Sequence, residues 1–343
     1  MKKIIILCLL VFVVIFSITG CEKNESKPKD KEEEKFTDLV DLRSEPFLID
    51  GKKYIPAHNR VPEGKKPLTV YFPDSNYMFL VPVTRFVDGD SDLFNSCIRE
   101  LQNGAGKSSG LSPYSPIGKI NNVYYESKDR QVTVDLSSED PKYAMGSTGS
   151  MVYLGSLLRS YAEIPDVDQI QFLLDGKKVE SIFHGSTDDD KPYKLRKHPE
   201  AYVLLETERR LYLLPAPNYE PFKTEVSKIE DLSKELFSIL KAGKKFGDFQ
   251  LKPTVQKDVK LNKVKRNENV LELDFNEVIK DDLFLKDKPN FVLLDSLVYT
   301  FTSIPGIDEI KISIEGKPLN TLNDVKFPES FKRFSVINDL TTE

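Results

Sequence analysis

The stretch "SYAEIPDVDQIQFLLDGKKVESI" (Ser160–Ile182) returns later in the chain as "TFTSIPGIDEIKISIEGKPLNTL" (Thr300–Leu322). Both versions carry an Ile-Pro pair, an aspartate, an alternating apolar run, and an acidic residue followed by Gly-Lys. The match extends upstream, where "VTVDLS" (Val132–Ser137) pairs with "LELDFN" (Leu271–Asn276). Self-similarity of this kind is the signature of a repeated structural unit. The sequence therefore predicts a tandem duplication.

Comparison of the two copies predicts the elements of each unit. Four apolar residues at i, i+3, i+4 and i+7 predict one helical face in the first copy: Phe94, Cys97, Ile98 and Leu101. The alternation in Val132–Leu136 predicts a strand with one buried face, joined to a preceding strand as a hairpin. A second helix is expected to end before Ile164-Pro165, because proline disfavours helix in the residue before it. The last strand turns at Asp175-Gly176, a favoured hairpin turn.

These elements place the chain in the α+β class. Each unit runs hairpin, helix, hairpin, helix, hairpin, so we expect two tandem small modules, each with two helices packed on a small sheet built from hairpins. Gly104 and Gly243 follow the first helix of each copy and are expected to end it. We expect a leader over 1–20, a charged tether with a candidate hairpin at Asp50-Gly51 over 21–65, a first domain over 66–186, a linker over 187–200, a second domain over 201–325 and a C-terminal tail over 326–343.

The composition limits the class of protein. The chain has 343 residues, of which 39% are hydrophobic and 30% charged, with a net charge of −5. That length suits about two domains, and the acidic balance argues against a nucleic-acid binder, which would carry a basic patch. Three cysteines, Cys8, Cys21 and Cys97, leave no disulfide framework once Cys8 is in the leader and Cys21 has another role.

The N-terminus reads as a secretory leader. Met1-Lys2-Lys3 is a basic start, and Ile4–Ile18 is an apolar run shorter than the roughly 20 residues of a membrane-spanning helix. Ile18-Thr19-Gly20-Cys21 resembles the lipobox of bacterial lipoproteins, which implies a diacylglyceryl group on the Cys21 thiol and cleavage before it. Glu22–Lys35 has no core-forming residues and is expected to be a solvated tether. The alternatives are an ordinary signal peptide or a short anchor helix; all place the body outside the cytoplasm.

Metal and nucleophile chemistry is not predicted. His58, His184 and His198 are scattered through connecting regions with no partners at ligand spacing, so each is expected to be a surface histidine, with no metal or cofactor. Cys97 lies on an apolar helical face and is expected to be a small buried hydrophobic residue. "GSTGS" (Gly146–Ser150) opens a helix but lacks the remainder of a phosphate-binding motif. Helix capping by its hydroxyl groups is the simpler interpretation.

Two pairs of aspartates recur in both copies, and a repeated acid can indicate a catalytic carboxylate pair. Asp135 and Asp274 fall on the phase of their strands that is expected to face solvent, in different modules. Asp168 and Asp308 follow a proline turn, where capping of backbone groups is the usual role. The sequence predicts no catalytic residue and no enzyme.

The repeated unit resembles the GerM domain family of spore-forming Gram-positive bacteria, also called the sporulation and germination domain. The resemblance rests on Phe79–Pro82, Leu111-Ser112-Pro113, Val132–Leu136 and "VDQIQFLLDGKKV" (Val167–Val179), and the second copy keeps this framework with some drift. It implies a fold similar to the ring-building motif of the sporulation secretion channel. It also implies a membrane-bound protein facing the space between mother cell and forespore.

The expected function is that of a membrane-anchored, extracytoplasmic structural or assembly factor in sporulation and germination. Its partners would be other sporulation envelope proteins in a transenvelope complex, and further copies of itself in an oligomer or ring. The drift between copies suggests that one module makes the intermolecular contact. The alternative is a cell-surface binding module for peptidoglycan or for a cell-wall enzyme partner.

Overall fold

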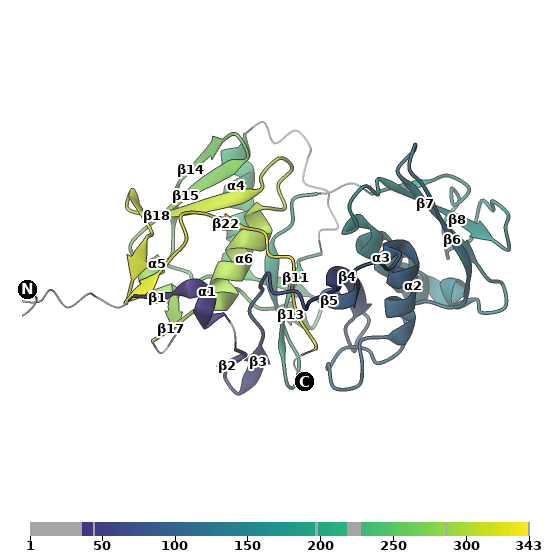
Figure 1. Ribbon diagram of the computed structural model, residues 1–343, viewed down its shortest axis with the longest axis horizontal. Helices are drawn as coiled ribbons and strands as arrows, with labels where there is room; N and C mark the ends of the chain where they lie inside the picture. Colours follow the sequence, from purple (N-terminus) through teal and green to yellow (C-terminus); the bar gives the residue numbers. More distant parts are fainter. Residues whose placement is uncertain (1–35, 44, 196–197, 218–227, 286, 342–343) are drawn as a thin grey trace, which may run out of the picture. The chain divides into compact units, whose positions relative to one another are not determined.

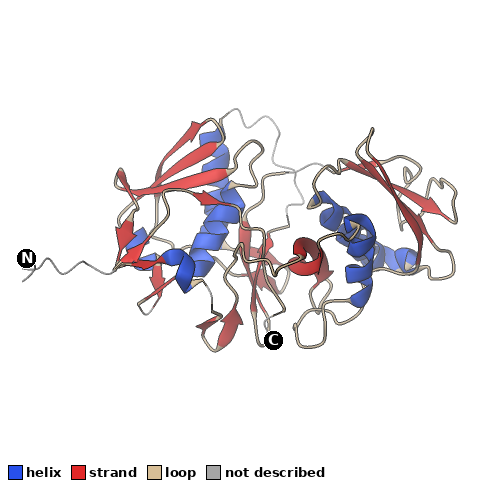
Figure 2. Cartoon of the chain, in the orientation of Figure 1, coloured by secondary structure: helices blue, strands red, loops and turns tan. Residues whose placement is uncertain are grey.

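The computed structural model describes residues 36–43, 45–195, 198–217, 228–285 and 287–341. The leader, Cys21 and the charged stretch up to Lys35 lie outside the described residues. Residues 36–343 form one compact unit. Figure 2 shows helices packed against small sheets throughout this unit, so the fold is of the mixed α and β kind.

The first domain opens with a long hairpin and continues with a second sheet. Its elements are β4 (Lys65–Pro73), β5 (Leu80–Asp88), α2 (Leu93–Asn103), β6 (Ile120–Glu126), β7 (Gln131–Leu136), a 3-10 turn (Lys142–Ala144), α3 (Gly146–Ala162), β8 (Gln169–Leu174) and β9 (Tyr193–Lys194). Helix α2 contacts β4 and β6, whereas α3 contacts β4 and β5. The opening hairpin and the β6-β7-β8-β9 sheet are separate sheets.

The second domain repeats this order (Figure 1). Its elements are β10 (Tyr202–Glu206), β11 (Leu211–Pro215), α4 (Ile229–Ala242), β12 (Lys244–Phe246), β13 (Phe249–Leu251), β14 (Leu261–Asn267), β15 (Val270–Phe275), α5 (Ile279–Asp282), β16 (Phe284–Leu285), β17 (Lys288–Pro289), α6 (Phe291–Phe301), β18 (Glu309–Ile314) and β19 (Lys317–Pro318). The strand order β14-β15-β18 matches β6-β7-β8, and β22 (Phe331–Lys332) pairs with the start of β18 as β9 pairs with the start of β8. The predicted duplication is therefore present in the topology as well as in the sequence.

The central strand pair of each sheet is parallel, which the prediction of a sheet built only from hairpins missed. Val134 on β7 pairs in parallel register with Phe172 on β8, and Leu273 on β15 pairs in the same way with Ile312 on β18. The reason is that α3 and α6 each return the chain across the sheet before the next strand begins. The expected closing hairpin is a single bridge, between Leu174 and Lys177, in the first domain.

The first helix of each domain ends at a glycine, as predicted. Gly104 and Gly243 follow α2 and α4 with φ of 74° and 67°. A Cβ on Gly104 would lie 2.9 Å from the carbonyl oxygen of Pro113. Both a left-handed backbone and a close neighbour therefore require glycine at this position.

Residues 36–65, predicted as a tether, fold against the second domain from Phe36 onward. They contain β1 (Thr37–Asp38), α1 (Leu39–Leu42), β2 (Phe47–Ile49) and β3 (Lys52–Tyr54), and β2 and β3 form the hairpin across Asp50-Gly51. The side chains of Leu39, Tyr54 and Ala57 are buried. The tether interpretation was wrong here because these few apolar residues find a surface on a distant part of the chain.

The linker and tail boundaries also need correction. Asp189, within the predicted linker 187–200, is fully buried and accepts hydrogen bonds from the backbone N–H of Ile182 (2.5 Å) and Phe183 (2.9 Å). Strand β9 then pairs with β8, so this stretch completes the first sheet. The predicted tail 326–343 is also structured. Strand β21 (Val325–Lys326), which pairs with β20 (Thr321–Leu322), crosses the predicted boundary, and β22 (Phe331–Lys332) lies within the tail and pairs with β18.

Candidate functional site at the junction of the two domains

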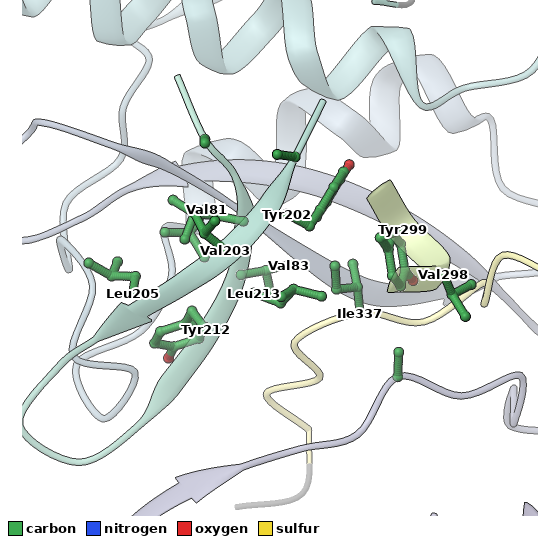
Figure 3. Packing of buried hydrophobic residues seen from close by; sticks show 14 of the residues in the cluster. Val81, Val83, Tyr202, Val203, Leu205, Tyr212, Leu213, Val298, Tyr299 and Ile337 are labelled. Atoms are coloured by element: carbon green, nitrogen blue, oxygen red, sulfur yellow. The ribbon is translucent and has the colours of Figure 1, made fainter. Parts of the chain in front are cut away.

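The opening hairpins of the two domains pack together. Strand β5 contacts β11, and Val81 and Val83 lie in one buried cluster with Val203 and Leu213 (Figure 3). The strands concerned, "LVPV" and "LYLLP", carry apolar residues on both faces, and strands of this kind are normally buried on both sides. The two domains therefore share one hydrophobic core.

The C-terminal segment joins the two hairpins through Asn338. The buried side-chain amide of Asn338 donates hydrogen bonds of 2.7 Å to the carbonyl oxygens of both Pro82 on β5 and Leu213 on β11. Its carbonyl oxygen accepts from the backbone N–H of Leu213 at 3.0 Å. The neighbouring Ile337 exchanges hydrogen bonds with Thr84. One asparagine thus satisfies three buried backbone groups from two domains.

A cluster of arginines and tyrosines lies next to this joint. The guanidinium of Arg333 donates to the hydroxyl of Tyr202 (2.8 Å) and lies 4.5 Å from the ring centre of Tyr299, a favourable cation–π geometry. Arg333 also lies 3.9 Å from the carboxylate of Glu163. That carboxylate accepts a hydrogen bond from the hydroxyl of Tyr71 (2.9 Å). Burial raises the pKa of Tyr202 to about 12, although Arg333 opposes the shift.

Two cavities open at this cluster, of about 300 Å³ and about 390 Å³. Both are lined by Tyr71, Glu163, Tyr202 and Arg333. The larger one also contains Arg159, which forms an ion pair with Glu200 at 2.9 Å. Aromatic faces with charged hydrogen-bonding groups suit a ligand rich in hydroxyl and amide groups. The cavities thus present tyrosine and arginine side chains that could bind such a ligand. Both arginines, Arg159 and Arg333, already have a carboxylate partner.

A buried ion pair fixes the N-terminal segment to α6. Asp295 accepts hydrogen bonds from Arg43 (2.5 Å), the hydroxyl of Tyr54 (2.9 Å) and the backbone N–H of Ala57 (2.8 Å). Burial raises the pKa of the Asp295 carboxyl, and Arg43 opposes that shift. Every residue of α6 is buried, because segment 36–57 and the C-terminal segment cover it.

The predicted histidine and cysteine sites have mixed outcomes. Cys97 is fully buried, as predicted, and burial raises the pKa of its thiol, so it is chemically inert. His184 and His198 are exposed. His58 is not a surface residue: it is buried, with its Nε2 3.6 Å from Asp339. Across the described ranges, no group of His, Cys, Asp or Glu could hold a metal ion.

The repeated aspartates serve the turns and not a shared site. Asp135 is buried, contrary to the prediction, and its carboxylate accepts the backbone N–H of Gly176 at 2.8 Å. Asp274 does the same for Gly316 at 2.7 Å. These bonds fix the turn after each parallel strand, which explains why both copies carry the acid.

The later pair of aspartates does not cap the backbone as predicted. Asp168 forms an ion pair with Arg130 (2.9 Å), and Asp308 accepts from the side-chain amide of Asn269 (2.8 Å). Both partners are side chains, so these contacts join the loops at one end of each sheet.

The glycine- and serine-rich start of α3 does not use its hydroxyl groups as N-caps. The residue before the helix is Met145, and no side chain caps the first turn. The hydroxyl of Ser150 instead donates to the carbonyl of Tyr143 and accepts from the backbone N–H of His184 (3.0 Å). No phosphate cradle follows from this arrangement.

The lipid-attachment residue Cys21 lies outside the described residues. Within the part of the chain that the structure describes, no helix is both long enough and apolar enough to span a membrane.

The fold and junction define a class of protein: a tandem pair of related mixed α and β domains joined into one body. The Germane family model, described as sporulation and spore germination, matches residues 69–180 and 202–320, which is more than half of the chain. The chain belongs to this family.

The fold is similar to that of a solved structure with two tandem domains. The tandem GerMN domains of the sporulation protein GerM from Bacillus subtilis match with a TM-score of 0.63 and 18% identity, over 80% of this chain and 99% of that one. The first GerMN domain of the same protein matches with a TM-score of 0.28 and 17% identity, over 40% of this chain and 96% of that one. No curated protein matches the chain at a significant level.

Proposed function

We propose that this protein is a membrane-anchored extracytoplasmic lipoprotein that acts as a structural and assembly factor in sporulation and germination. It works by protein–protein contacts in a transenvelope complex between mother cell and forespore. In this proposal each module acts as a ring-building motif, and a lipid on Cys21 is the anchor. Membership of a sporulation and germination family supports the process.

The observation that carries the proposal is the junction. Asn338 joins Pro82 and Leu213, and beside it Arg333 contacts Tyr202 and Glu163. A scaffold needs its two domains at a fixed relation, whereas an enzyme needs reactive groups in a cleft. Among the described residues, the junction holds the two domains at a fixed relation, and no nucleophile is paired with a base.

The test is the count of heat-resistant spores from a strain deleted for this protein. Wild type and Cys8→Ala are expected to restore spores, because Cys8 lies within the apolar leader and carries no lipid. Cys21→Ala is expected to restore far fewer at equal protein level, since it lacks the pair of acyl chains that gives stable lipid anchoring. Normal spore counts from the deletion strain would contradict the proposal.

The larger junction cavity favours a second candidate, binding of peptidoglycan. Arg159, Glu200 and Tyr71 present charged and aromatic groups of the kind that recognise sugars and short peptides. Co-sedimentation with purified cell wall tests it. Saturable binding that is lost in Arg159→Ala, but kept when the exposed Arg99 is changed to Ala, would favour this candidate over the scaffold.

A further inference from the structure

The two related helices α3 and α6 differ in what covers them. Helix α6 is buried on all sides, and segment 36–57 contributes Arg43, Tyr54 and Phe47 to its cover. Helix α3 has no such cover: Met151, the counterpart of Phe291, is 64% exposed. The first domain therefore leaves open the face that the second domain fills with a segment of its own chain.

The open face is part of an apolar groove of about 280 Å³. The groove lies between the β4–β5 turn, α3 and the end of β11, and its side chains include Tyr77, Met78, Thr148, Met151, Pro215 and Pro217. Among the described residues that line it, Arg159 is the one with a charged side chain, and it is already paired with Glu200. Because Pro215 and Pro217 come from the second domain, the groove exists only while the domains are joined.

Methionine is concentrated at this place. The described residues contain Met78, Met145 and Met151, and all three are exposed. Methionine is flexible and polarisable, and it is frequent on surfaces that bind apolar partners. Two of the three, Met78 and Met151, line the groove, and exposed methionines in an apolar groove are typical of a surface that binds an apolar partner.

The segment that covers α6 has a second apolar face. Its inward side chains pack on α6, while Val40 and Leu48 point away and are each 69% exposed. Phe36 and Leu42 are exposed as well. Covering these aliphatic side chains with an apolar partner would remove their surface from water, which is favourable.

The groove fits this outward face better than the inward one. At the position of Asp295, which holds Arg43, the first domain has Gly155, so α3 offers no acid there to pair with an arginine. Leu80 already covers Gly155, since a Cβ there would lie 2.7 Å from its Cδ1, so the open part of the groove is at Met151. The described side chains around it are mostly apolar, and an uncharged aliphatic side chain such as Leu48 suits them.

We propose that Val40 and Leu48 of one copy dock in the α3 groove of a second copy, so that copies associate head to tail. Each copy carries one groove and one apolar segment at different places, so the contact is heterologous and leaves a free groove and a free segment at its ends. The contact area is small, so the association is weak in solution. It is favoured by the high local concentration at a membrane, a point that rests on the proposed lipid anchor.

Disulfide crosslinking between two single variants tests the proposal. The protein from residue 21 onward, with Cys21→Ser, is made as Leu48→Cys and as Met151→Cys; Cys97 is buried and does not interfere. A mixture of the two is expected to form at least ten times more crosslinked dimer than either variant alone. The matched control is Leu48→Cys with Tyr114→Cys, an exposed aromatic residue outside the groove.

Each outcome decides the question. A mixture that crosslinks no better than the control overturns the proposal, and so does efficient crosslinking of Met151→Cys with itself, which would indicate a symmetric contact. Sedimentation gives a second readout: Met151→Glu and Leu48→Glu should each remove wild-type self-association, while an equimolar mixture regains heterodimer. If crosslinking fails but spore formation still requires Cys21, this inference falls and the proposed function stands.

Discussion

The side-chain amide of Asn338 lies 2.7 Å from the carbonyl oxygen of Pro82, which ties the end of the chain to the opening hairpin of the first domain. The same amide bonds to Leu213 of the second domain. The C-terminal segment is therefore part of the junction between domains, and its loss should destabilise both domains.

Substitution of Asn338 by Ala tests this joint. Three buried backbone groups lose their partner, each at a cost of about 1–3 kcal/mol, and packing can relax only partly. We expect the free energy of unfolding in urea to fall by about 3 kcal/mol or more. Asn262→Ala, on an exposed position of β14, should change it by less than about 0.5 kcal/mol. Equal effects of the two changes would refute the role of Asn338.

Removal of the Asp295 carboxylate should release the N-terminal segment. Asp295→Ala leaves Arg43 charged and buried with the hydroxyl of Tyr54 unpaired. Breaking such a pair costs about 3–5 kcal/mol. We expect faster proteolysis within residues 36–57 before the domains unfold. Asp308→Ala, at an exposed acid, is the control and should leave proteolysis unchanged.

Alkaline pH should destabilise the fold through its buried tyrosines. Burial raises the pKa of Tyr202 and of Tyr193 to about 12, from 10.0. The folded state keeps these protons where the unfolded chain loses them, so this stability is present below pH 10 and is lost as the pH rises from 10 to 12. Each group contributes a slope of up to about 1.4 kcal/mol per pH unit.

The measurement is the unfolding free energy between pH 9 and pH 12. Tyr202→Phe should flatten its decline by the slope of one proton, whereas Tyr114→Phe, at an exposed position, should leave the decline as it is in the wild type. If the unfolding free energy of Tyr202→Phe declined as steeply with pH as that of the wild type, the proton of Tyr202 would not contribute to the pH dependence.

The glycine that ends α2 should not tolerate a side chain. Gly104→Ala combines a positive φ of 74° with a Cβ only 2.9 Å from a backbone oxygen, which cannot move aside easily. Gly176 has a similar φ of 77° but nothing within 4 Å. We expect Gly104→Ala to lower the midpoint of thermal unfolding clearly more than Gly176→Ala, which carries only the cost of a left-handed backbone, about 1–2 kcal/mol. Equal shifts would mean that the close contact is relieved at no cost.

The sequence allows most of each module to be predicted, because the duplication lets one copy check the other. Helix α2, the strands of each β6–β7 type hairpin and the glycine stops follow from period and turn chemistry. The parallel pairing of β7 with β8 does not follow, since hydrophobic alternation reports burial and not which strand is the neighbour.

The junction could not be predicted for a related reason. "SVINDL" around Asn338 is too short to show a period, and its partners are distant in sequence. One signal was available: Asp295 is a lone acid in the otherwise uncharged helix "FVLLDSLVYTF", which points to a buried partner. That partner, Arg43, lies within residues 21–65, which the charged composition predicts to be a tether.

The central claim is that two sporulation-family domains act as one joined body, and spore yield of an opened junction tests it most directly. A deletion strain would carry Asn338→Ala or the control Asn262→Ala at equal protein level. Hydrogen exchange would confirm that β5 and β11 are deprotected in the first variant alone. The account predicts a large loss of heat-resistant spores for Asn338→Ala and none for Asn262→Ala. Normal spore yield from the variant whose junction is open would contradict it.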